Sequence, residues 1–315
     1  MIVVCGEALV DMVPQQCGEE PGYVPRPGGS PYNVAIGLAR LGAPTGFLGR
    51  LGTDRFGRLL RGHLEENGVD KRYVSSGAEH TTLAFVHAGD GQDVEYNFYT
   101  ENSADRNLSP ADLPTALAPK VEALHFGSFS LALEPGASTL AALMDREQGK
   151  RLITLDPNVR QQIIGDRESY RSRLEGWVAA ADLVKASAAD LSWLYPDLAP
   201  ERVAEDWLQT GPALVVVTQG GEGSAGFGRH VSASARAPHV KVVDTVGAGD
   251  SFMSGAVAWL HHHGKLDAGR LDELTAQELE DLLLYASRAS ALTCTRAGAD
   301  PPTEAELAAF AYGAD

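Results

Sequence analysis

From residue 121 onward, strand-like apolar runs alternate with helical stretches, and this rhythm limits the fold more than any other feature. The runs are rich in Val, Ile, Leu and Phe, and the stretches between them repeat apolar residues at helical spacing. Parallel strands need a crossover connection, usually a helix, and such helices cover both faces of the sheet. The sequence therefore predicts an α/β fold with a doubly wound, mainly parallel sheet. Strands are expected at 121–126, 152–156, 182–185 and 213–218, and helices at 137–148, 168–180, 200–209 and 274–295.

The first part of the chain starts the same rhythm and then departs from it twice. Strands are expected at 2–5 and 45–51, and helices at 31–41 and 54–67. Residues 12–27 are rich in Pro, Gly and Gln, while apolar residues alternate with a period of two across 81–99, on both sides of Gly89-Asp90-Gly91. That alternation indicates a β-hairpin. We therefore expect one α/β domain, made of residues 1–11, 28–80 and 105–315, and a small β-subdomain, made of residues 12–27 and 81–104.

Charge and cysteine content narrow the function. The chain has 42 acidic and 26 basic residues, a net charge of −16, which argues against a nucleic-acid or acidic membrane partner. Its three cysteines form no CxxC pair, as expected in a reducing cytosol without disulfides or a zinc site. No apolar run reaches the length of a membrane span, and the first basic residue is Arg26, too late for a secretory leader. We expect a cytoplasmic protein that binds neither nucleic acid nor membrane.

The motif Asp244-Thr-Val-Gly-Ala-Gly-Asp250 follows a strand-like run (240–243) and opens an amphipathic helix. Gly247 and Gly249 allow a tight turn and a close approach to a ligand, and free N–H groups at a helix start bind anions such as phosphate. A carboxylate in such a site repels phosphate, so Asp250 needs a purpose. It can take the proton from a hydroxyl that attacks phosphorus, or it can simply cap the helix. The flanking glycines and Asp244 favour catalysis.

Other polar residues follow the ends of expected strands. Asp11 ends the first βα unit, where open α/β sheets bind ligands, and its carboxylate can accept two sugar hydroxyls. Gly28-Gly29 and Asn33 offer close backbone approach and an amide, although a turn and a helix start would use the same residues. Arg160 offers a fork for oxygen ligands or a surface ion pair. Lys185 can neutralise nucleotide phosphates.

Several tempting motifs do not carry the chemistry that they suggest. Residues 221–226 match GxGxxG, but 227–237 lack the helical period that a dinucleotide site requires. The chain contains no GxxxxGK[ST] phosphate loop and no Gly-x-Ser-x-Gly elbow of a hydrolase. Successive histidines at 261–263 point in different directions on a helix, so one metal ion cannot take all three.

Two of the motifs together resemble the signatures of a known family. Residues 244–252, Asp-Thr-Val-Gly-Ala-Gly-Asp-Ser-Phe, resemble the C-terminal signature of the ribokinase-like (PfkB) family of sugar and nucleoside kinases. Gly28-Gly29 followed by Asn33 resembles its N-terminal signature. The resemblance implies a ribokinase-like fold and transfer of the γ-phosphoryl group of Mg²⁺-ATP to a sugar hydroxyl. It also implies that the small β-subdomain is a lid over the sugar, of the kind that often supplies a homodimer contact.

The resemblance assigns roles to individual residues. The amides of Gly247, Ala248 and Gly249 would form an anion hole, and Asp250 would be the catalytic base. Residues 218–223, Thr-Gln-Gly-Gly-Glu-Gly, are similar to the family's Thr-x-Gly-x-x-Gly nucleotide loop. The sugar-binding residues would be Asp11, Gly28, Gly29, Asn33, Phe98, Arg160 and Asp250. The ATP-binding residues would be Lys185, Ser187, Thr218, Gly220, Gly223, Gly249 and Ser287.

Cation sites are implied in the same way. Where the family often has Asn-x-x-Glu, this chain has Ser187-x-x-Asp190, and Asp190 would assist Mg²⁺. Ser187 also suits the N-cap of the next helix. Residues 295–299 resemble the family's closing loop, where a monovalent cation such as K⁺ can lie behind the anion hole. The residues holding it would be Asp244, Val246, Thr293 and Gly298.

The substrate is indicated by two shorter stretches. Phe126-Gly-Ser-Phe-Ser130 and Tyr99 with Ser103-Ala-Asp105 look similar to fructokinases, so fructose is the expected acceptor. A 2-keto-3-deoxygluconate kinase and an aminoimidazole-riboside or other nucleoside kinase are the alternatives within the family. A non-catalytic sensor that binds nucleotide and sugar is an alternative of a different class, although the intact Asp250 speaks against it.

Overall fold

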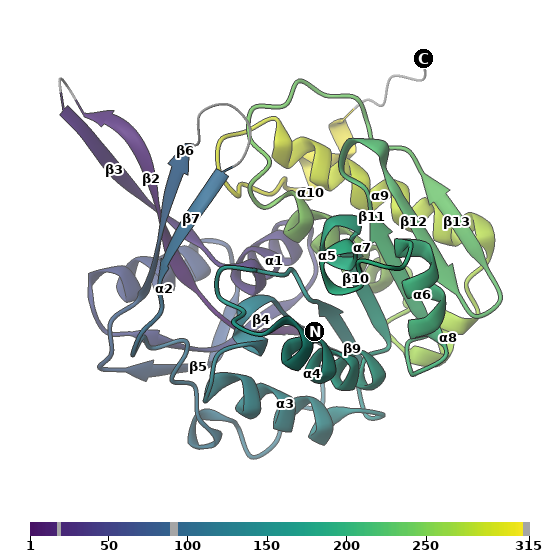
Figure 1. Cartoon of the computed structure of the whole chain (residues 1–315), viewed down its shortest axis with the longest axis horizontal. Helices are drawn as coiled ribbons and strands as arrows, with labels where there is room; N and C mark the ends of the chain where they lie inside the picture. Colours follow the sequence, from purple (N-terminus) through teal and green to yellow (C-terminus); the bar gives the residue numbers. More distant parts are fainter. Residues whose placement is uncertain (18–19, 89–93, 311–315) are drawn as a thin grey trace.

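The computed structural model describes residues 1–17, 20–88 and 94–310, and its centre is a nine-stranded sheet (Figure 1). The strand order is β13-β12-β11-β10-β9-β8-β1-β4-β5. Neighbouring strands pair in parallel from β5 to β11, and β12 and β13 add antiparallel pairs at one edge. The strands are β1 (Ile2–Cys5), β4 (Thr45–Gly52), β5 (Asp70–Gly77), β8 (Ala123–Gly127), β9 (Leu152–Asp156), β10 (Leu183–Ser187), β11 (Leu214–Thr218), β12 (Ser224–Gly228) and β13 (Ser232–Ala235).

Helices bury both faces of this sheet, which confirms the predicted doubly wound α/β fold. In β1, Ile2 and Val4 point into one core, and Val3 and Cys5 point into the other. The first core is completed by α1 (Ser30–Arg40), α2 (Arg55–Glu66), α7 (Ala248–His262), α8 (Ala268–Asp272), α9 (Ala276–Cys294) and α10 (Glu304–Ala309). The second is completed by α3 (Gly136–Glu147), α4 (Arg167–Ala180), α5 (Ala188–Leu194) and α6 (Pro200–Leu208).

A second, four-stranded sheet projects from the large one at the purple and blue end of the chain (Figure 1). It has the order β3-β2-β6-β7, with β2 (Leu9–Cys17), β3 (Glu20–Gly28), β6 (Thr82–Ala88) and β7 (Val94–Tyr99). The β2–β3 and β6–β7 pairs are antiparallel, and β2 pairs with β6 in parallel. The expected small sheet is therefore confirmed, although β2 already begins at Leu9. The turn expected at Gly89-Asp90-Gly91 lies outside the described residues.

The strand expected at 240–243 is wrong. These residues belong to no strand, and Val242 and Val243 are 57% and 60% exposed. Val240 and Val242 instead line a cleft, so a ligand-sized space and not a neighbouring strand lies against these apolar side chains. Strands β5, β12 and β13 were not predicted because their sequences are dominated by polar residues, Gly and Ala. Such edge strands are specified by pairing more than by their own hydrophobicity.

The carboxyl ends of neighbouring parallel strands bring polar residues to one edge of the sheet. β9 ends at Asp156, β10 at Ser187 and β11 at Thr218, and these three strands are adjacent. Open α/β sheets bind ligands at this edge. Helix α7, buried on nearly every side from Asp250 to Leu260, starts at the same edge. None of the described helices is long and apolar enough to cross a membrane.

Candidate active site

Two cavities meet at the first turn of α7. One, here called the polar cavity, has a volume of about 440 Å³ and is lined by Asp11, Asn33, Arg160 and Asp250 among others. The other, here called the glycine-rich cleft, has a volume of about 410 Å³. Gly249 and Thr245 line both, so a molecule in one cavity can reach a molecule in the other there. The predicted ATP-binding residues that line the cleft are Thr218, Gly220, Gly223, Gly249 and Ser287.

Asp250 is buried at the end of the polar cavity, and side chains from two other segments hold its carboxylate. Its Oδ1 accepts hydrogen bonds from Ser30 Oγ at 2.7 Å and from Asn158 Nδ2 at 3.2 Å. Its Oδ2 accepts one from Asn33 Nδ2 at 2.8 Å. Burial raises the pKa of Asp250, while the bonds from Asn33 and Ser30 oppose that rise by favouring the charged form. A fixed carboxylate that retains proton affinity is what a general base requires.

Asp11 and the glycine pair that precedes α1 lie together at one wall of the site. Burial raises the pKa of Asp11 to about 7, and Arg160 opposes that rise. A Cβ on Gly28 would lie 2.2 Å from Asp11 Oδ2, so a larger residue at position 28 would displace this carboxylate from its position. Gly29 has a φ of 104°, a conformation that favours glycine, and it lines the polar cavity with Asp11. Gly28 does not line the cavity, so it contributes to the site only by leaving space for the Asp11 side chain.

Aromatic rings form a further wall of the polar cavity. Phe98, from β7, stacks on Tyr96 with ring centroids 5.6 Å apart and meets Phe129 edge-to-face at 5.6 Å. All three rings line the cavity. A sugar bound there would have polar groups on one side and an apolar face on the other, which suits a ring with both hydroxyl and C–H surfaces.

The turn before α7 supplies free amides. Gly247 has a φ of 75°, and a Cβ there would lie 2.6 Å from the Cβ of Ala299. Within the described chain, the N–H groups of Gly247 and Gly249 have no acceptor, whereas Ala248 donates to Thr245 O at 3.2 Å. Two of the three predicted amides are therefore free to bind an anion, at the positive end of the helix dipole.

The residues predicted to hold a monovalent cation lie behind this turn. Asp244 accepts hydrogen bonds from Val246 N at 3.0 Å and from Gly298 N at 2.7 Å, which ties two loops together. Thr293 donates to Ser251 Oγ at 2.7 Å, on the first turn of α7. The structure thus shows how these residues support the anion site, and their role toward a cation stays a prediction.

Lys185 and Ser187 line neither cavity. Lys185 Nζ forms an ion pair with Asp156 Oδ2 at 2.8 Å. Burial alone would lower the pKa of Lys185, but the attraction of Asp156 is larger, and the pKa is raised. A Cβ on Gly249 would lie 3.0 Å from this ammonium, so Lys185 supports the anion site from behind. Ser187 Oγ accepts from Asp190 N at 3.0 Å and caps α5.

Asp190 is held by the loop that follows β9. Its Oδ1 accepts from Val159 N at 3.2 Å, and burial raises its pKa. In the part of the chain that the structure describes, no three His, Cys, Asp or Glu side chains group as metal ligands. The role of Asp190 toward Mg²⁺ stays a prediction.

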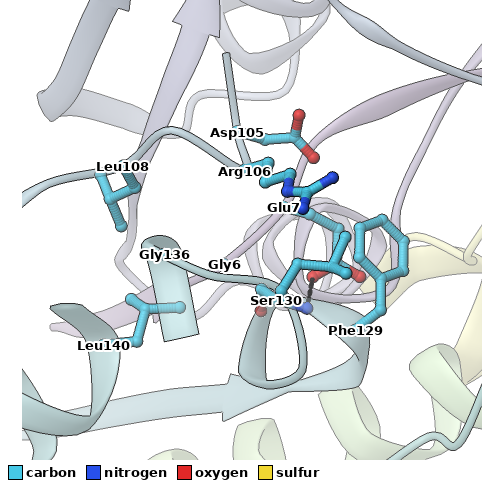
Figure 2. Close-up of a pocket in the computed structure, with 10 residues that line it drawn as sticks. Gly6, Glu7, Asp105, Arg106, Leu108, Phe129, Ser130, Gly136 and Leu140 are labelled. Carbon is cyan, nitrogen blue, oxygen red and sulfur yellow. Dashed lines mark hydrogen bonds between the residues drawn. The ribbon is translucent and has the colours of Figure 1, made fainter. Parts of the chain in front are cut away.

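Three residues of the site were not assigned from the sequence. Ser30 and Asn158 were given no role in the site from the sequence, yet both donate to Asp250. Glu7 was not singled out either, although it lines the polar cavity and lies beside Ser130 and Phe129 at a void of about 10 Å³ (Figure 2). Burial raises the pKa of Glu7 to about 7. The sequence signal for Asn158 is its place after Asp156-Pro157 in a turn, where Asn adopts a positive φ.

Comparison with known proteins decides what this arrangement belongs to. The family model described as pfkB family carbohydrate kinase matches residues 1–306. The chain belongs to the pfkB family of carbohydrate kinases. As a pfkB kinase it is a phosphotransferase with an alcohol group as acceptor, as the two signatures predicted.

Similar pfkB kinases match over nearly the whole chain. A fructokinase of Rhizobium leguminosarum bv. trifolii is 40% identical over 283 residues, covering 89% of this chain and 86% of that protein. A fructokinase of Xylella fastidiosa, solved with bound ATP, has a TM-score of 0.90 at 27% identity and covers 98% of this chain and 97% of that one. A fructokinase of Vibrio cholerae O395, solved with fructose, ADP and calcium, has a TM-score of 0.84 at 29% identity and covers 98% of both chains.

Proposed function

We propose that this pfkB kinase transfers the γ-phosphoryl group of ATP to fructose. The observation that carries the proposal is the position of Asp250, which is buried at the polar cavity beside the free amides of Gly247 and Gly249, and Gly249 also borders the glycine-rich cleft. A sugar in the first cavity and a triphosphate in the second would meet at Gly249. The relatives named fructokinase support the choice of sugar.

The reaction follows from these positions. Asp250 takes the proton of the acceptor hydroxyl, whose oxygen forms a bond to the γ-phosphorus while the bond to the departing ADP breaks. The free N–H groups of Gly247 and Gly249 stabilise the charge that develops on the phosphoryl oxygens. The nucleotide arrives as its Mg²⁺ complex, in which the metal neutralises phosphate charge, and Asp190 is the acid proposed to assist it. K⁺ behind the anion site would act through the loop that Asp244 ties together, which is tested by assaying in K⁺ against choline.

The charges of the polar cavity favour a neutral sugar over an acidic one. Glu7, Asp11 and Asp250 line it, against Arg160 as the one cation among its described lining residues. Arg160 Nη1 also donates to Asn158 Oδ1 at 2.6 Å, so its charge is partly engaged. A 2-keto-3-deoxygluconate carboxylate would meet more negative than positive charge, whereas fructose hydroxyls can donate to Asp11.

The small sheet is proposed as a lid over the sugar and as a homodimer contact. Its inner face presents Asp11 and Phe98 to the polar cavity. Its outer face carries an aromatic cluster, in which Phe85 contacts Tyr23 at 5.0 Å and Tyr99 at 5.5 Å between ring centroids. Tyr23 is 42% and Tyr99 is 61% exposed, and a second copy of the sheet would cover them. Light scattering after gel filtration should give a dimer mass for the wild type and a smaller one for Tyr99→Glu.

A coupled ADP-release assay tests the function. The panel is fructose, ribose, 2-keto-3-deoxygluconate, aminoimidazole riboside and a blank without sugar. We expect fructose to give the highest kcat/KM, and a higher value for another sugar would replace fructose in the proposal. Binding of ATP and sugar by calorimetry without any ADP release would indicate the sensor. Cell fractionation tests the proposed cytoplasmic location.

A further inference from the structure

The hydrogen bonds around Asp250 have one consistent direction. Arg160 Nη1 donates to Asn158 Oδ1 at 2.6 Å, which turns the amide nitrogen of Asn158 away from Arg160. That nitrogen donates to Ser30 Oγ at 2.7 Å and to Asp250 Oδ1 at 3.2 Å. A flipped amide would set NH₂ against the guanidinium and oxygen against the carboxylate, so it is excluded. Because Ser30 Oγ accepts from Asn158, its own proton goes to Asp250 Oδ1, 2.7 Å away.

This direction makes the two oxygens of Asp250 unequal. A carboxylate has about four acceptor sites, two on each oxygen. Oδ1 has two donors, Ser30 and Asn158, whereas Oδ2 has one, Asn33. A free acceptor site therefore remains on Oδ2, and a proton arriving at Oδ1 would have to displace a donor.

The backbone of Asn158 also holds this residue in position. Its φ is 37°, a left-handed conformation that Asn, Asp and Gly adopt more readily than other residues. Its N–H donates to Asp156 Oδ1 at 3.1 Å, and Asp156 is in turn paired with Lys185. The amide that reaches Asp250 is thus fixed from both its side chain and its main chain.

We propose that Ser30 and Asn158 are positioning residues that orient the catalytic base, so that the acceptor hydroxyl gives its proton to Oδ2 of Asp250. The inference rests on the proposed role of Asp250 and not on which sugar is the acceptor. Both residues donate to the charged form, so losing either should also raise the pKa of the base. The charged groups that act on Asp250 are Asp156, Arg160, Asp11 and Lys185, and they stay in every variant.

The test compares Ser30→Ala, Asn158→Gly and Asn158→Asp with the wild type, using whichever sugar the panel returns. Glycine and aspartate both tolerate the left-handed backbone, so these variants change the amide and not the turn. Asn102→Gly is the matched control, because Asn102 has a φ of 51° and lies exposed outside the site. Thermal melts show whether each variant is folded.

We expect kcat to fall about 10- to 100-fold in Ser30→Ala and Asn158→Gly, as for loss of a hydrogen bond to a charged group, with each KM within about threefold. The acid limb of the pH profile should move to higher pH, and furthest in Asn158→Asp, where a second carboxylate faces the base. A purely structural role would lower activity without moving that limb. Asn102→Gly should match the wild type.

Three results overturn the inference. The first is that Ser30→Ala and Asn158→Gly both keep kcat within twofold of wild type and leave the acid limb of the pH profile unmoved. If Asp250→Asn is inactive at the same time, the proposed function stands but this inference does not. Another is a loss confined to the sugar KM, which would make the two residues sugar contacts. The third is a sugar complex in which the phosphorylated hydroxyl lies on Oδ1. A wild type that phosphorylates no sugar removes the proposed function itself.

Discussion

Asp250→Asn separates the chemistry of the site from its binding. The side chain keeps its size, but an amide cannot accept a proton at neutral pH. Asp250 takes donors on both oxygens, from Ser30 and Asn158 on one and from Asn33 on the other. An asparagine oxygen can face Ser30 and Asn158, but its NH₂ then faces the NH₂ of Asn33.

The magnitude follows from these contacts. A positioned general base contributes about 10²- to 10⁴-fold in rate, which is about 3 to 5 kcal/mol of barrier. Leaving Asn33 without its acceptor costs about 1 to 3 kcal/mol of stability. Burial raises the pKa of Asp250, so the folded protein disfavours the ionised form, and the neutral amide offsets part of that cost. We therefore expect a collapse of kcat with a melting temperature within about 4 °C of wild type.

The assay is ADP release at saturating sugar and ATP, with calorimetry for the affinity of each ligand. Affinities should stay within a few-fold, because Asp11, Phe98 and the amides of the anion site are unchanged. Asp145→Asn, on the exposed face of α3, is the control for removing a helical carboxylate. Turnover above one-tenth of the wild-type rate in Asp250→Asn would refute the assignment of the base.

Three further predictions follow, two on stability and one on ATP affinity. Burial raises the pKa of Glu7 from 4.5 to about 7, so the folded state favours the protonated form. About 3 kcal/mol of folding stability should therefore be present below pH 4.5 and be lost as the pH rises through 7. Urea melts at pH 5 and pH 8 should show the loss, and Glu7→Gln should make the two stabilities more nearly equal. Lys185→Met leaves buried Asp156 unpaired and should cost about 3 to 5 kcal/mol in urea melts. Gly247→Ala meets a neighbouring Cβ at 2.6 Å and should lose ATP affinity by calorimetry, whereas Gly264→Ala, with a similar positive φ and open space, should not.

The body of the fold could be predicted because its buried strands carry their own signal. Residues 2–5 and 152–156 match β1 and β9 end to end, since strands covered on both faces are continuously apolar. Edge strands such as β13 lack this signal. The run at 240–243 was misinterpreted because β-branched residues favour a strand only where another strand pairs with them, and here Val240 and Val242 line the cleft instead.

The site could be predicted only where its residues are local. Gly247, Gly249 and Asp250 lie in one turn, so their spacing alone suggests an anion site with a base. The bond from Ser30 to Asp250 spans 220 positions, and that from Asn158 spans 92. Such contacts depend on which strand ends become neighbours in the sheet, and no pattern within one segment contains that information.

The proposed function places a triphosphate close to several acidic residues, in a chain of net charge −16. Most of these carboxylates are occupied by other donors. Asp244 accepts from two backbone N–H groups, Asp156 from Lys185 and the Asn158 N–H, and Asp190 from another backbone N–H.

These carboxylates therefore fix the loops that hold the free amides of Gly247 and Gly249 in place. Asp11 and Asp250 line the polar cavity and not the cleft. The carboxylates that can accept hydrogen bonds from sugar hydroxyls thus lie in the polar cavity, whereas no Asp or Glu is among the described residues that line the cleft. It follows that adding a carboxylate at the cleft, as in Ser287→Asp, should weaken ATP binding far more than sugar binding, because Ser287 lines only the cleft. Equal weakening of both ligands would show that the two cavities do not separate charge in this way.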